Sequence, residues 1–151
     1  MKKTYIYLIC ISVIILAIIL GKYYNYKAKI SELKEFNLEY EYYYQREIYG
    51  TEIATVINRA IDNNLKNEVE REYKETDDKK LYFFKQNDIN SINIDIKMID
   101  NNKTYKMESL YQGEITKFVE NYNYIKFKCT RIDYNKNGQV CYMLFEQITI
   151  I

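Results

Sequence analysis

An apolar run near the N-terminus constrains the chain more than any other feature. It extends from Tyr5 to Leu20 without a charged residue, and two lysines precede it. A core helix in a small soluble domain needs a polar outer face, whereas the only polar interruptions here are Cys10 and Ser12. As a helix, the run would extend about 24 Å at ~1.5 Å per residue. Because a bilayer core is ~30 Å thick and tyrosines flank the run at both ends, the pattern predicts a membrane-spanning helix.

Three processed forms of such a segment fit the residues less well than an uncleaved anchor. A cleaved signal peptide needs small residues in an A-x-A spacing, which Ala17 and Gly21 do not provide. A lipoprotein needs a small residue before its cysteine, but Ile9 precedes Cys10. A prepilin leader needs a glycine before the run and a glutamate just inside it, and both are missing. We predict an N-terminal membrane anchor over residues 1–21.

The charges that flank the run give opposing indications of its orientation. Lys2 and Lys3 favour a cytoplasmic N-terminus, while the more numerous lysines after the run favour the reverse. A short basic leader before an apolar run is the usual arrangement of a signal anchor. We therefore expect a single-pass protein of the cell membrane whose C-terminal domain is extracytoplasmic.

Composition argues against several classes of function. The chain has 151 residues, which leaves about 130 for one small domain outside the membrane. A net charge of +1 argues against a nucleic-acid partner, because nucleic-acid binders usually carry a strong basic excess. The chain has no histidine, the commonest general base and metal ligand. Phosphate-binding glycine loops, nucleophile elbows, C-x-x-C motifs and zinc-ligand spacings are also missing. We predict a non-enzymatic protein without a cofactor.

Residues 22–49 are expected to continue the anchor as a protruding amphipathic helix, because they are rich in Glu, Lys, Leu and Tyr and contain no glycine or proline. A stripe with alternating steps of three and four residues comprises Tyr23, Tyr26, Ile30, Leu33, Asn37, Tyr40 and Tyr44. The stripe is typical of a coiled-coil seam with Asn37 as its polar position, and also of a helix that packs on the chain's own sheet. In the first interpretation, Ile30, Leu33, Tyr40 and Tyr44 contact an assembly partner or a second copy of the chain.

Residues 50–151 are predicted to form a small α+β domain. Gly50 separates it from the preceding helix, Thr51 can cap a helix over Glu52–Asn63, and the charged stretch Leu65–Lys80 is expected to be irregular with a turn at Thr76-Asp77-Asp78. Strands are expected at Leu81–Lys85, Ser91–Met98, Lys103–Met107, Tyr124–Asp133 and Gln139–Ile150, with one helix inserted at Glu114–Tyr122. Because helices precede strands, the order indicates an α+β fold with a small antiparallel sheet.

The segment between the last two strands supports two interpretations. It matches the first half of a calcium loop, D-x-N-x-N-G, with Asp133, Asn135 and Asn137 as candidate metal ligands. The twelfth position of such a loop is a bidentate glutamate, but here it is Leu144. Asn137-Gly138 is also a strong hairpin signal. An extracytoplasmic ligand- or calcium-binding sensor domain is therefore the alternative function that this segment suggests.

The same hairpin bears on the two C-terminal cysteines. With Asn137-Gly138 at the turn, Lys136 faces Gln139 and Cys129 falls opposite Glu146. An extracytoplasmic location would permit a disulfide between Cys129 and Cys141, but that bond would need a different register. We predict free thiols.

Four segments carry a resemblance to a known family. They are Tyr49–Asn64, Asn90–Lys97, Lys106–Glu108 and Phe127–Thr130. From Ile48 to Glu146, the chain resembles a family of uncharacterised, membrane-anchored proteins of low-GC Gram-positive bacteria. The resemblance implies a setting and no activity.

The predicted arrangement is also similar to that of a pilin or pseudopilin, in which the membrane half of a long helix anchors the protein and the outer half packs on a sheet. We therefore predict a structural or accessory role in a cell-envelope or secretion assembly of the pilus type, in which the long helix contacts a partner or a second copy.

Overall fold

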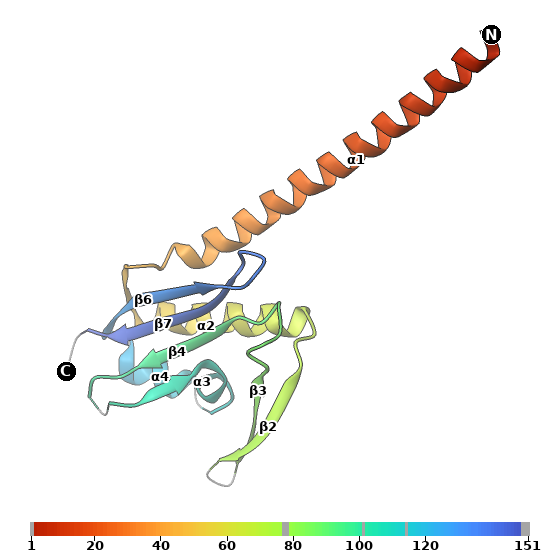
Figure 1. Ribbon diagram of the computed structural model, residues 1–151. Coiled ribbons are helices and arrows are strands. Elements are labelled where there is room, and N and C mark those ends of the chain that lie inside the picture. The colour runs from red at the N-terminus through yellow and green to blue at the C-terminus, as the bar shows by residue number, and fades with distance from the viewer. Residues whose placement is uncertain (1, 77–78, 101, 114, 149–151) are drawn as a thin grey trace. The chain divides into compact units, whose positions relative to one another are not determined.

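The computed structural model describes residues 2–76, 79–100, 102–113 and 115–148 (Figure 1). The chain divides into two compact units, Met1–Phe36 and Asn37–Ile151. Helix α1 (Lys2–Glu41) supplies the first unit, and its last residues begin the second. The second unit has an α+β fold, as the sequence predicts, with a five-stranded sheet, a two-stranded ribbon and helices α2, α3 and α4.

Helix α1 ends at Glu41, so the prediction of a continuous helix through residues 22–49 is wrong at its C-terminal end. The N–H groups of Tyr43 and Tyr44 bond carbonyls three residues back, and Gln45 has a φ of 60°. The ring of Tyr43 packs edge-on against Phe145 at 6.4 Å, and the N–H of Gln45 donates to the Cys129 carbonyl at 2.9 Å. Contacts with the sheet therefore end the helix where the local sequence would continue it.

The five-stranded sheet has the order β1-β6-β7-β4-β5. Its strands are β1 (Glu47–Tyr49), β4 (Asn93–Lys97), β5 (Thr104–Lys106), β6 (Lys126–Tyr134) and β7 (Val140–Gln147). All neighbours are antiparallel except β4 and β7, which pair in parallel, so the prediction of an antiparallel sheet is wrong at this one pairing. The parallel register aligns Ile94 with Met143 and Ile96 with Phe145. All four are at most 1% exposed, so this pairing lets both strands bury their apolar residues on one face.

Helix α2 (Gly50–Lys66) covers one face of this sheet (Figure 1). Its apolar residues recur at helical spacing, as predicted, and Ile53, Ile57 and Ile61 are fully buried. Burying one such side chain contributes roughly 1.5–3 kcal/mol. Helix α4 (Ile115–Tyr122) lies where a helix was predicted, whereas α3 (Met107–Gly113), which precedes it, was not predicted. Residue 114, the predicted start of the helix at α4, lies outside the described residues.

Helix α2 begins two residues earlier than predicted, at Gly50. Tyr49 precedes it, and its N–H donates to the Glu52 carboxylate at 3.0 Å, so Glu52 closes the first turn instead of Thr51. A Cβ atom at Gly50 would collide with the backbone carbonyl of Tyr122 at the end of α4. Glycine is therefore required here because two backbones approach closely.

Strands β2 (Arg71–Thr76) and β3 (Lys79–Phe84) form an antiparallel ribbon that extends away from the main sheet (Figure 1). The prediction that residues 65–80 are irregular is therefore wrong for most of this stretch, while Asp77 and Asp78 of the predicted turn lie outside the described residues. The side-chain amide of Gln112 donates to the Tyr82 carbonyl at 2.6 Å and accepts from the Tyr82 N–H at 2.9 Å. Glu108 accepts from the Phe84 N–H at 3.2 Å. Side chains of α3 thus hold β3 as a neighbouring strand would.

The β6–β7 hairpin turns one residue earlier than predicted. Asn135 N–H donates to the Gln139 carbonyl at 2.8 Å, and Gly138 takes a φ of 78°, which gives a three-residue loop. Cys129 pairs with Phe145 and not with Glu146, because the register shifts between Cys129 and Arg131. Two irregularities, one near each end of the hairpin, compensate for each other, and the predicted register holds between them, where Asp133 pairs with Tyr142.

Candidate functional site

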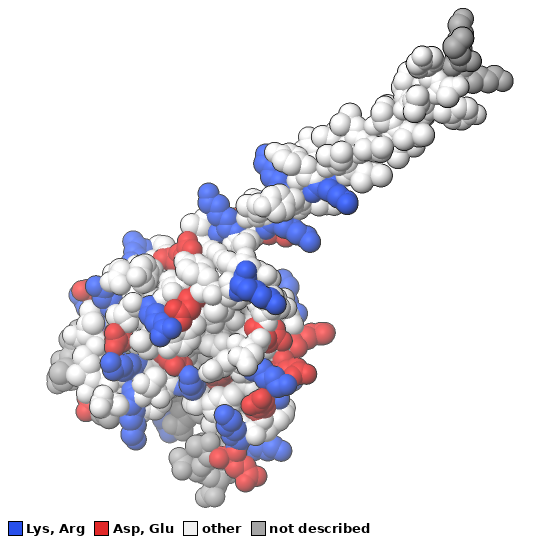
Figure 2. Space-filling view, viewed as in Figure 1, with Lys and Arg blue, Asp and Glu red and all other residues white. Residues whose placement is uncertain are grey.

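The apolar part of α1 is long and apolar enough to span a membrane, and none of it is buried against the rest of the chain. Its large side chains are about half exposed or more, for example Ile9 at 62% and Leu16 at 57%. Figure 2 shows this segment as an almost uninterrupted white surface, with basic side chains only toward its C-terminal part. Water would solvate such a surface poorly, whereas hydrocarbon matches it.

The predicted partner stripe divides between the two units. Ile30 is 47% exposed and Leu33 is partly exposed, so both remain accessible on the first unit. Tyr40 is 1% exposed, so its assignment as a partner contact is wrong: it lies in the domain core. Tyr44 is 49% exposed but lies beyond the end of α1, in a bridge with Cys129.

The polar position of the stripe shows why Tyr40 turns inward. The Asn37 side chain donates to the Gly138 carbonyl at 2.7 Å and accepts from the Val140 N–H at 2.9 Å. The last turn of α1 is therefore fastened to the β6–β7 hairpin. From Asn37 onward, the second interpretation of the stripe, packing on the chain's own sheet, is the correct one.

The three candidate calcium ligands take part in a hairpin turn. The Asn135 side-chain oxygen accepts the N–H groups of Asn137 at 2.8 Å and Gln139 at 3.1 Å. Asp133 forms an ion pair with Arg131 at 2.6 Å. Across the described residues, no three Cys, Asp or Glu side chains cluster to hold a metal ion. The observed geometry is thus that of a turn in which the side-chain oxygens of Asp133 and Asn135 already have partners.

The register keeps the two C-terminal cysteines apart. Cys129 pairs with Phe145, while the Cys141 thiol donates to the Asp133 carbonyl at 3.5 Å. Four residues of β6 separate these positions, or about 13 Å at ~3.3 Å per residue, which exceeds the reach of a disulfide. Burial raises the pKa of the Cys129 thiol to about 11.

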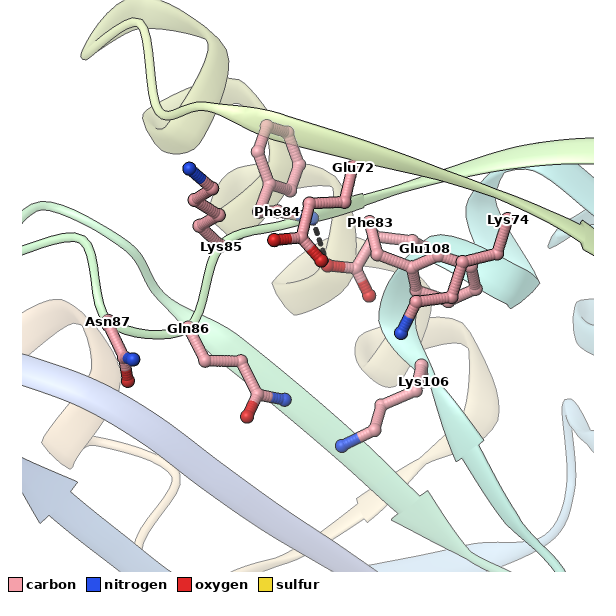
Figure 3. Close-up of a pocket in the computed structure, with 9 residues that line it drawn as sticks. All are labelled: Glu72, Lys74, Phe83, Phe84, Lys85, Gln86, Asn87, Lys106 and Glu108. Atoms are coloured by element: carbon pink, nitrogen blue, oxygen red, sulfur yellow. Dashed lines mark hydrogen bonds between the residues drawn. The ribbon is translucent and has the colours of Figure 1, made fainter.

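A cleft of about 610 Å³ lies between the ribbon and the start of α3 (Figure 3). It is lined by Glu72, Lys74, Phe83, Phe84, Lys85, Gln86, Asn87, Lys106 and Glu108. Glu108 is 3% exposed, and burial raises the pKa of its carboxyl. A perturbed carboxyl in a cleft is a feature of many functional sites. The sequence analysis missed Glu108, because its burial depends on the β2–β3 ribbon, whose Phe84 N–H it accepts across 24 residues of sequence.

The lysines of the cleft are committed to neighbouring groups. Lys85 forms an ion pair with Glu70, Lys106 bonds Asp95 at 2.8 Å, and Lys74 lies over the Phe83 ring at 5.5 Å. None of the described lining residues carries a hydroxyl or thiol. The cleft therefore offers a buried carboxyl and an aromatic wall, but no nucleophile beside a base.

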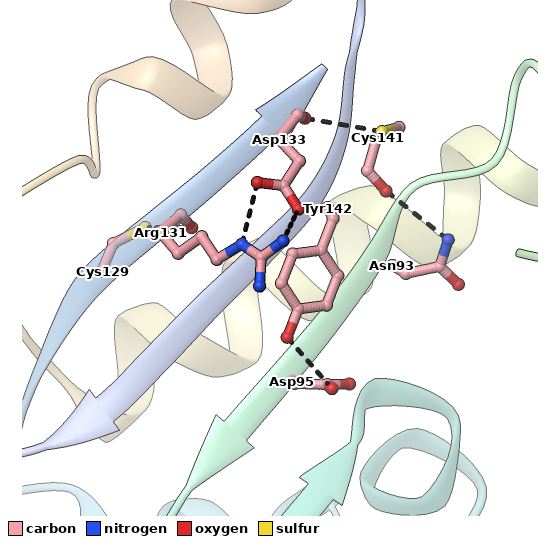
Figure 4. A network of polar contacts seen from close by, with 7 residues as sticks. All are labelled: Asn93, Asp95, Cys129, Arg131, Asp133, Cys141 and Tyr142. Atoms are coloured by element: carbon pink, nitrogen blue, oxygen red, sulfur yellow. Dashed lines mark hydrogen bonds and ion pairs between the residues drawn. The ribbon is translucent and has the colours of Figure 1, made fainter. Parts of the chain in front are cut away.

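A polar network lies on the sheet face opposite the apolar residues of β4 and β7 (Figure 4). The Asp95 carboxylate, on a residue 8% exposed, accepts from Lys106 at 2.8 Å and from the Tyr142 hydroxyl at 3.2 Å. Burial, reinforced by the Asp95 charge, raises the pKa of Tyr142 to about 12. Arg131 lies over the Tyr142 ring and bonds Asp133. The network joins β4, β5, β6 and β7, so it stabilises their register.

Alternation along residues 91–98 placed Asp95 on the polar face of its strand, which is where it lies. Local sequence could not indicate the network, because its partners come from β5 and β7.

Comparison with known proteins found no relative of this chain. No protein-family model matches the chain, and no curated protein or solved structure matches it significantly.

Proposed function

We propose that this chain is a single-pass, membrane-anchored protein whose α+β domain is extracytoplasmic and has a structural or accessory role in a cell-envelope assembly. The observation that carries the proposal is the unburied apolar surface of α1. A soluble domain would have to leave this surface in water, whereas a membrane removes it from water at roughly 25 cal/mol per Å².

The contacts of the buried carboxyls and the surface charge of the domain support a non-enzymatic role. Among the described residues, the two most buried carboxyls, Glu108 and Asp95, accept hydrogen bonds from the backbone or from Lys106 and Tyr142. These contacts join elements of the domain, as expected of residues that stabilise a fold. Figure 2 shows charges of both signs interspersed over the visible face of the domain, which suits an exposed soluble module.

The similarity to pilins is a proposal about layout. A long helix that is apolar in one half and joined to an α+β domain supports it, as does the attachment of Asn37 to the β6–β7 hairpin. Ile30 and Leu33 are the stripe residues that remain accessible for an assembly contact. The resemblance to membrane-anchored proteins of low-GC Gram-positive bacteria is consistent with the same setting.

A topology experiment tests the extracytoplasmic placement. Cys129 is buried and its thiol pKa is about 11, so it will react poorly with a maleimide. Tyr124 is 84% exposed, so the variant Tyr124→Cys in a Cys10→Ser background provides an accessible thiol. We expect an impermeant maleimide to label this variant in intact cells, with the Cys10→Ser chain as the background control. Labelling only after lysis would place the domain in the cytoplasm and overturn the surface role.

A second experiment tests the assembly role. A photo-crosslinking residue at Ile30 or Leu33 should yield a discrete crosslinked product in cells, and the same residue at the exposed position Tyr124 serves as the matched control. A full chain that yields no product from either α1 position, and that is monomeric in mild detergent, would contradict an assembly through this helix.

A further inference from the structure

The β3 edge of the β2–β3 ribbon is bonded to α3, whereas the β2 edge is open among the described residues, and this difference indicates a binding surface. Tyr82 and Phe84 direct their N–H groups outward from β3, where Gln112 and Glu108 accept them. The residues opposite them, Tyr73 and Arg71, therefore form non-hydrogen-bonded pairs within the ribbon. In a non-hydrogen-bonded pair, the N–H and C=O groups of both residues point away from the partner strand. Arg71, Tyr73 and Glu75 therefore direct these groups to the outer edge of β2.

No backbone hydrogen bond joins this outer edge to any part of the chain that the structure describes. All residues from Arg71 to Glu75 are exposed, with Tyr73 at 58%. An open strand edge is a ready template for another strand, and natural proteins often protect it with charged side chains, proline or a bulge. β2 has no proline, and its ladder with β3 is regular from Arg71 to Thr76.

The charges of β2 are arranged to attract a second copy of itself. The strand reads Arg71-Glu72-Tyr73-Lys74-Glu75, in which each charge has its opposite at the same distance on the other side of Tyr73. We propose that two copies of this chain associate through antiparallel pairing of their β2 edges about a two-fold axis at Tyr73. Arg71 then lies opposite Glu75 of the second copy, Glu72 opposite its Lys74, and Tyr73 opposite its Tyr73.

The alternation of outward-pointing backbone groups along β2 fits this register. Arg71, Tyr73 and Glu75 all point their backbone groups outward, and this register pairs them only with one another. Each such pair is a hydrogen-bonded pair of an antiparallel ladder. The result is a continuous four-stranded sheet, β3-β2-β2-β3, which is far more stable than a two-stranded ribbon alone.

Other alignments of the same two edges are disfavoured by charge. A parallel, in-register pairing would place Arg71 against Arg71 and Glu75 against Glu75. An antiparallel pairing centred on residue 72 would place Glu72 against Glu72, and one centred on residue 74 would place Lys74 against Lys74. Like charges directly opposite each other destabilise a ladder, so the charge pattern selects the Tyr73-centred register.

Disulfide trapping on the full chain tests the pairing. In the proposed register the two Tyr73 Cα atoms lie about 5.5 Å apart, within the disulfide range, so Tyr73→Cys in a Cys10→Ser background should form a dimer on mild oxidation. The control is Lys80→Cys on β3, because three strand spacings, or ~14 Å, would separate the two copies of β3. Absence of the Tyr73→Cys dimer, equal trapping of both variants, or trapping to a different protein would each overturn the proposal.

Charge reversal tests the register without a new covalent bond. Arg71→Glu or Glu75→Arg alone should weaken the dimer about tenfold or more, because two symmetry-related attractions become repulsions. The double variant carrying both changes should restore it, since the pairs are then opposite in sign again. Association is measured by analytical ultracentrifugation in detergent, and near-UV circular dichroism verifies that each variant is folded. Failure of the double variant to recover dimerisation would exclude the Tyr73-centred register.

Discussion

The apolar run of α1 and the apolar face of α2 contain the same residue types in opposite surroundings. Ile15 in α1 is 51% exposed, whereas Ile57 in α2 is fully buried. The difference lies in the pattern. Apolar residues in α2 recur at steps of three and four with polar residues between them, so one face can meet a sheet. The run in α1 is apolar all round, so a sheet on one side would leave the other side uncovered. The comparison teaches that periodicity, and not apolar content, separates a lipid-facing helix from a core helix.

The largest expected effect comes from charging the run of α1. Ile11→Lys combined with Ile15→Lys places two ammonium groups near its centre, at a cost of about 5–7 kcal/mol for membrane insertion. We expect the variant to be lost from the carbonate-resistant membrane fraction, while the domain remains folded. Ile11→Val with Ile15→Val is the apolar control. Retention of the doubly charged chain in the membrane fraction would contradict an anchoring role for α1.

An isoleucine-to-alanine substitution should change the stability of the domain at Ile57 in α2 but not at Ile15 in α1. Ile57→Ala leaves a cavity in the core of the second unit and should lower the free energy of unfolding by about 2–5 kcal/mol. Ile15→Ala removes no contact from that core, so the change should stay within about 0.5 kcal/mol. Thermal unfolding of the full chain in detergent, followed by near-UV circular dichroism of the tyrosines, measures both. Equal losses of stability would mean that the first unit packs on the domain.

Two glycines provide a third comparison, because both are helical in the structure. Gly50→Ala would drive a methyl group into the Tyr122 backbone, which cannot rotate away, and should destabilise the domain by about 1–3 kcal/mol. Apart from the neighbouring backbone of its own helix, no described atom lies within 4 Å of a Cβ at Gly21, so Gly21→Ala should be tolerated and should favour the helix by up to about 1 kcal/mol. Thermal unfolding again measures the first effect, and helix content by far-UV circular dichroism measures the second. An unchanged melting temperature for Gly50→Ala would show that α2 and α4 are less closely packed than described.

These comparisons also show which parts of the fold could be read from the sequence. Helix α2, strand β4 and the β6–β7 hairpin depend on local periodicity or turn chemistry, and all three were predicted close to their observed positions. The class, α+β, follows from their order. Elements held mainly by distant partners were not predicted correctly. The charged strand β2 has no apolar face and forms because it pairs with β3, which side chains of α3 hold in place. Helix α1 stops at Glu41 because Tyr43 packs on Phe145.

The candidate site was less predictable than the fold, for the same reason. Glu108 has no neighbour in sequence that would bury it, and its burial follows from the Phe84 N–H that it accepts across 24 residues. The turn at Asp133–Gly138 was recognisable as a hairpin, but the three-residue loop and the two compensating irregularities were not. Near the turn, Asn37 of α1 accepts the Val140 N–H and the Cys141 thiol donates to the Asp133 carbonyl, and no local pattern encodes these contacts.

The apolar run of α1 contains no charged residue, whereas the domain buries the ionisable carboxyl of Glu108. The cost of burying a charge can therefore be measured at Glu108. Burial raises the pKa of this carboxyl above the ordinary value of about 4.5, which the unfolded chain retains. The protonated form therefore favours the folded state, and this contribution is complete below the unfolded pKa and is lost as the pH rises through the folded one. Glu108→Gln stays neutral at every pH, and its amide oxygen can still accept the Phe84 N–H.

The expected result is that Glu108→Gln gains stability over the unmodified chain as the pH rises from about 4 to 8, by ~1.4 kcal/mol for each pKa unit of the shift. Melting temperatures of both chains across this range measure the difference. Glu146 supplies the matched control, because its ion pair with Lys97 lowers the pKa of that carboxyl. Its charged form therefore favours folding, so Glu146→Gln should be less stable than the unmodified chain above the unfolded pKa of about 4.5, and this deficit should shrink as the pH falls through the lowered folded pKa. A pH-independent difference for Glu108→Gln would mean that the domain interior accommodates this charge without penalty, so the contrast with α1 would rest on apolar pattern alone.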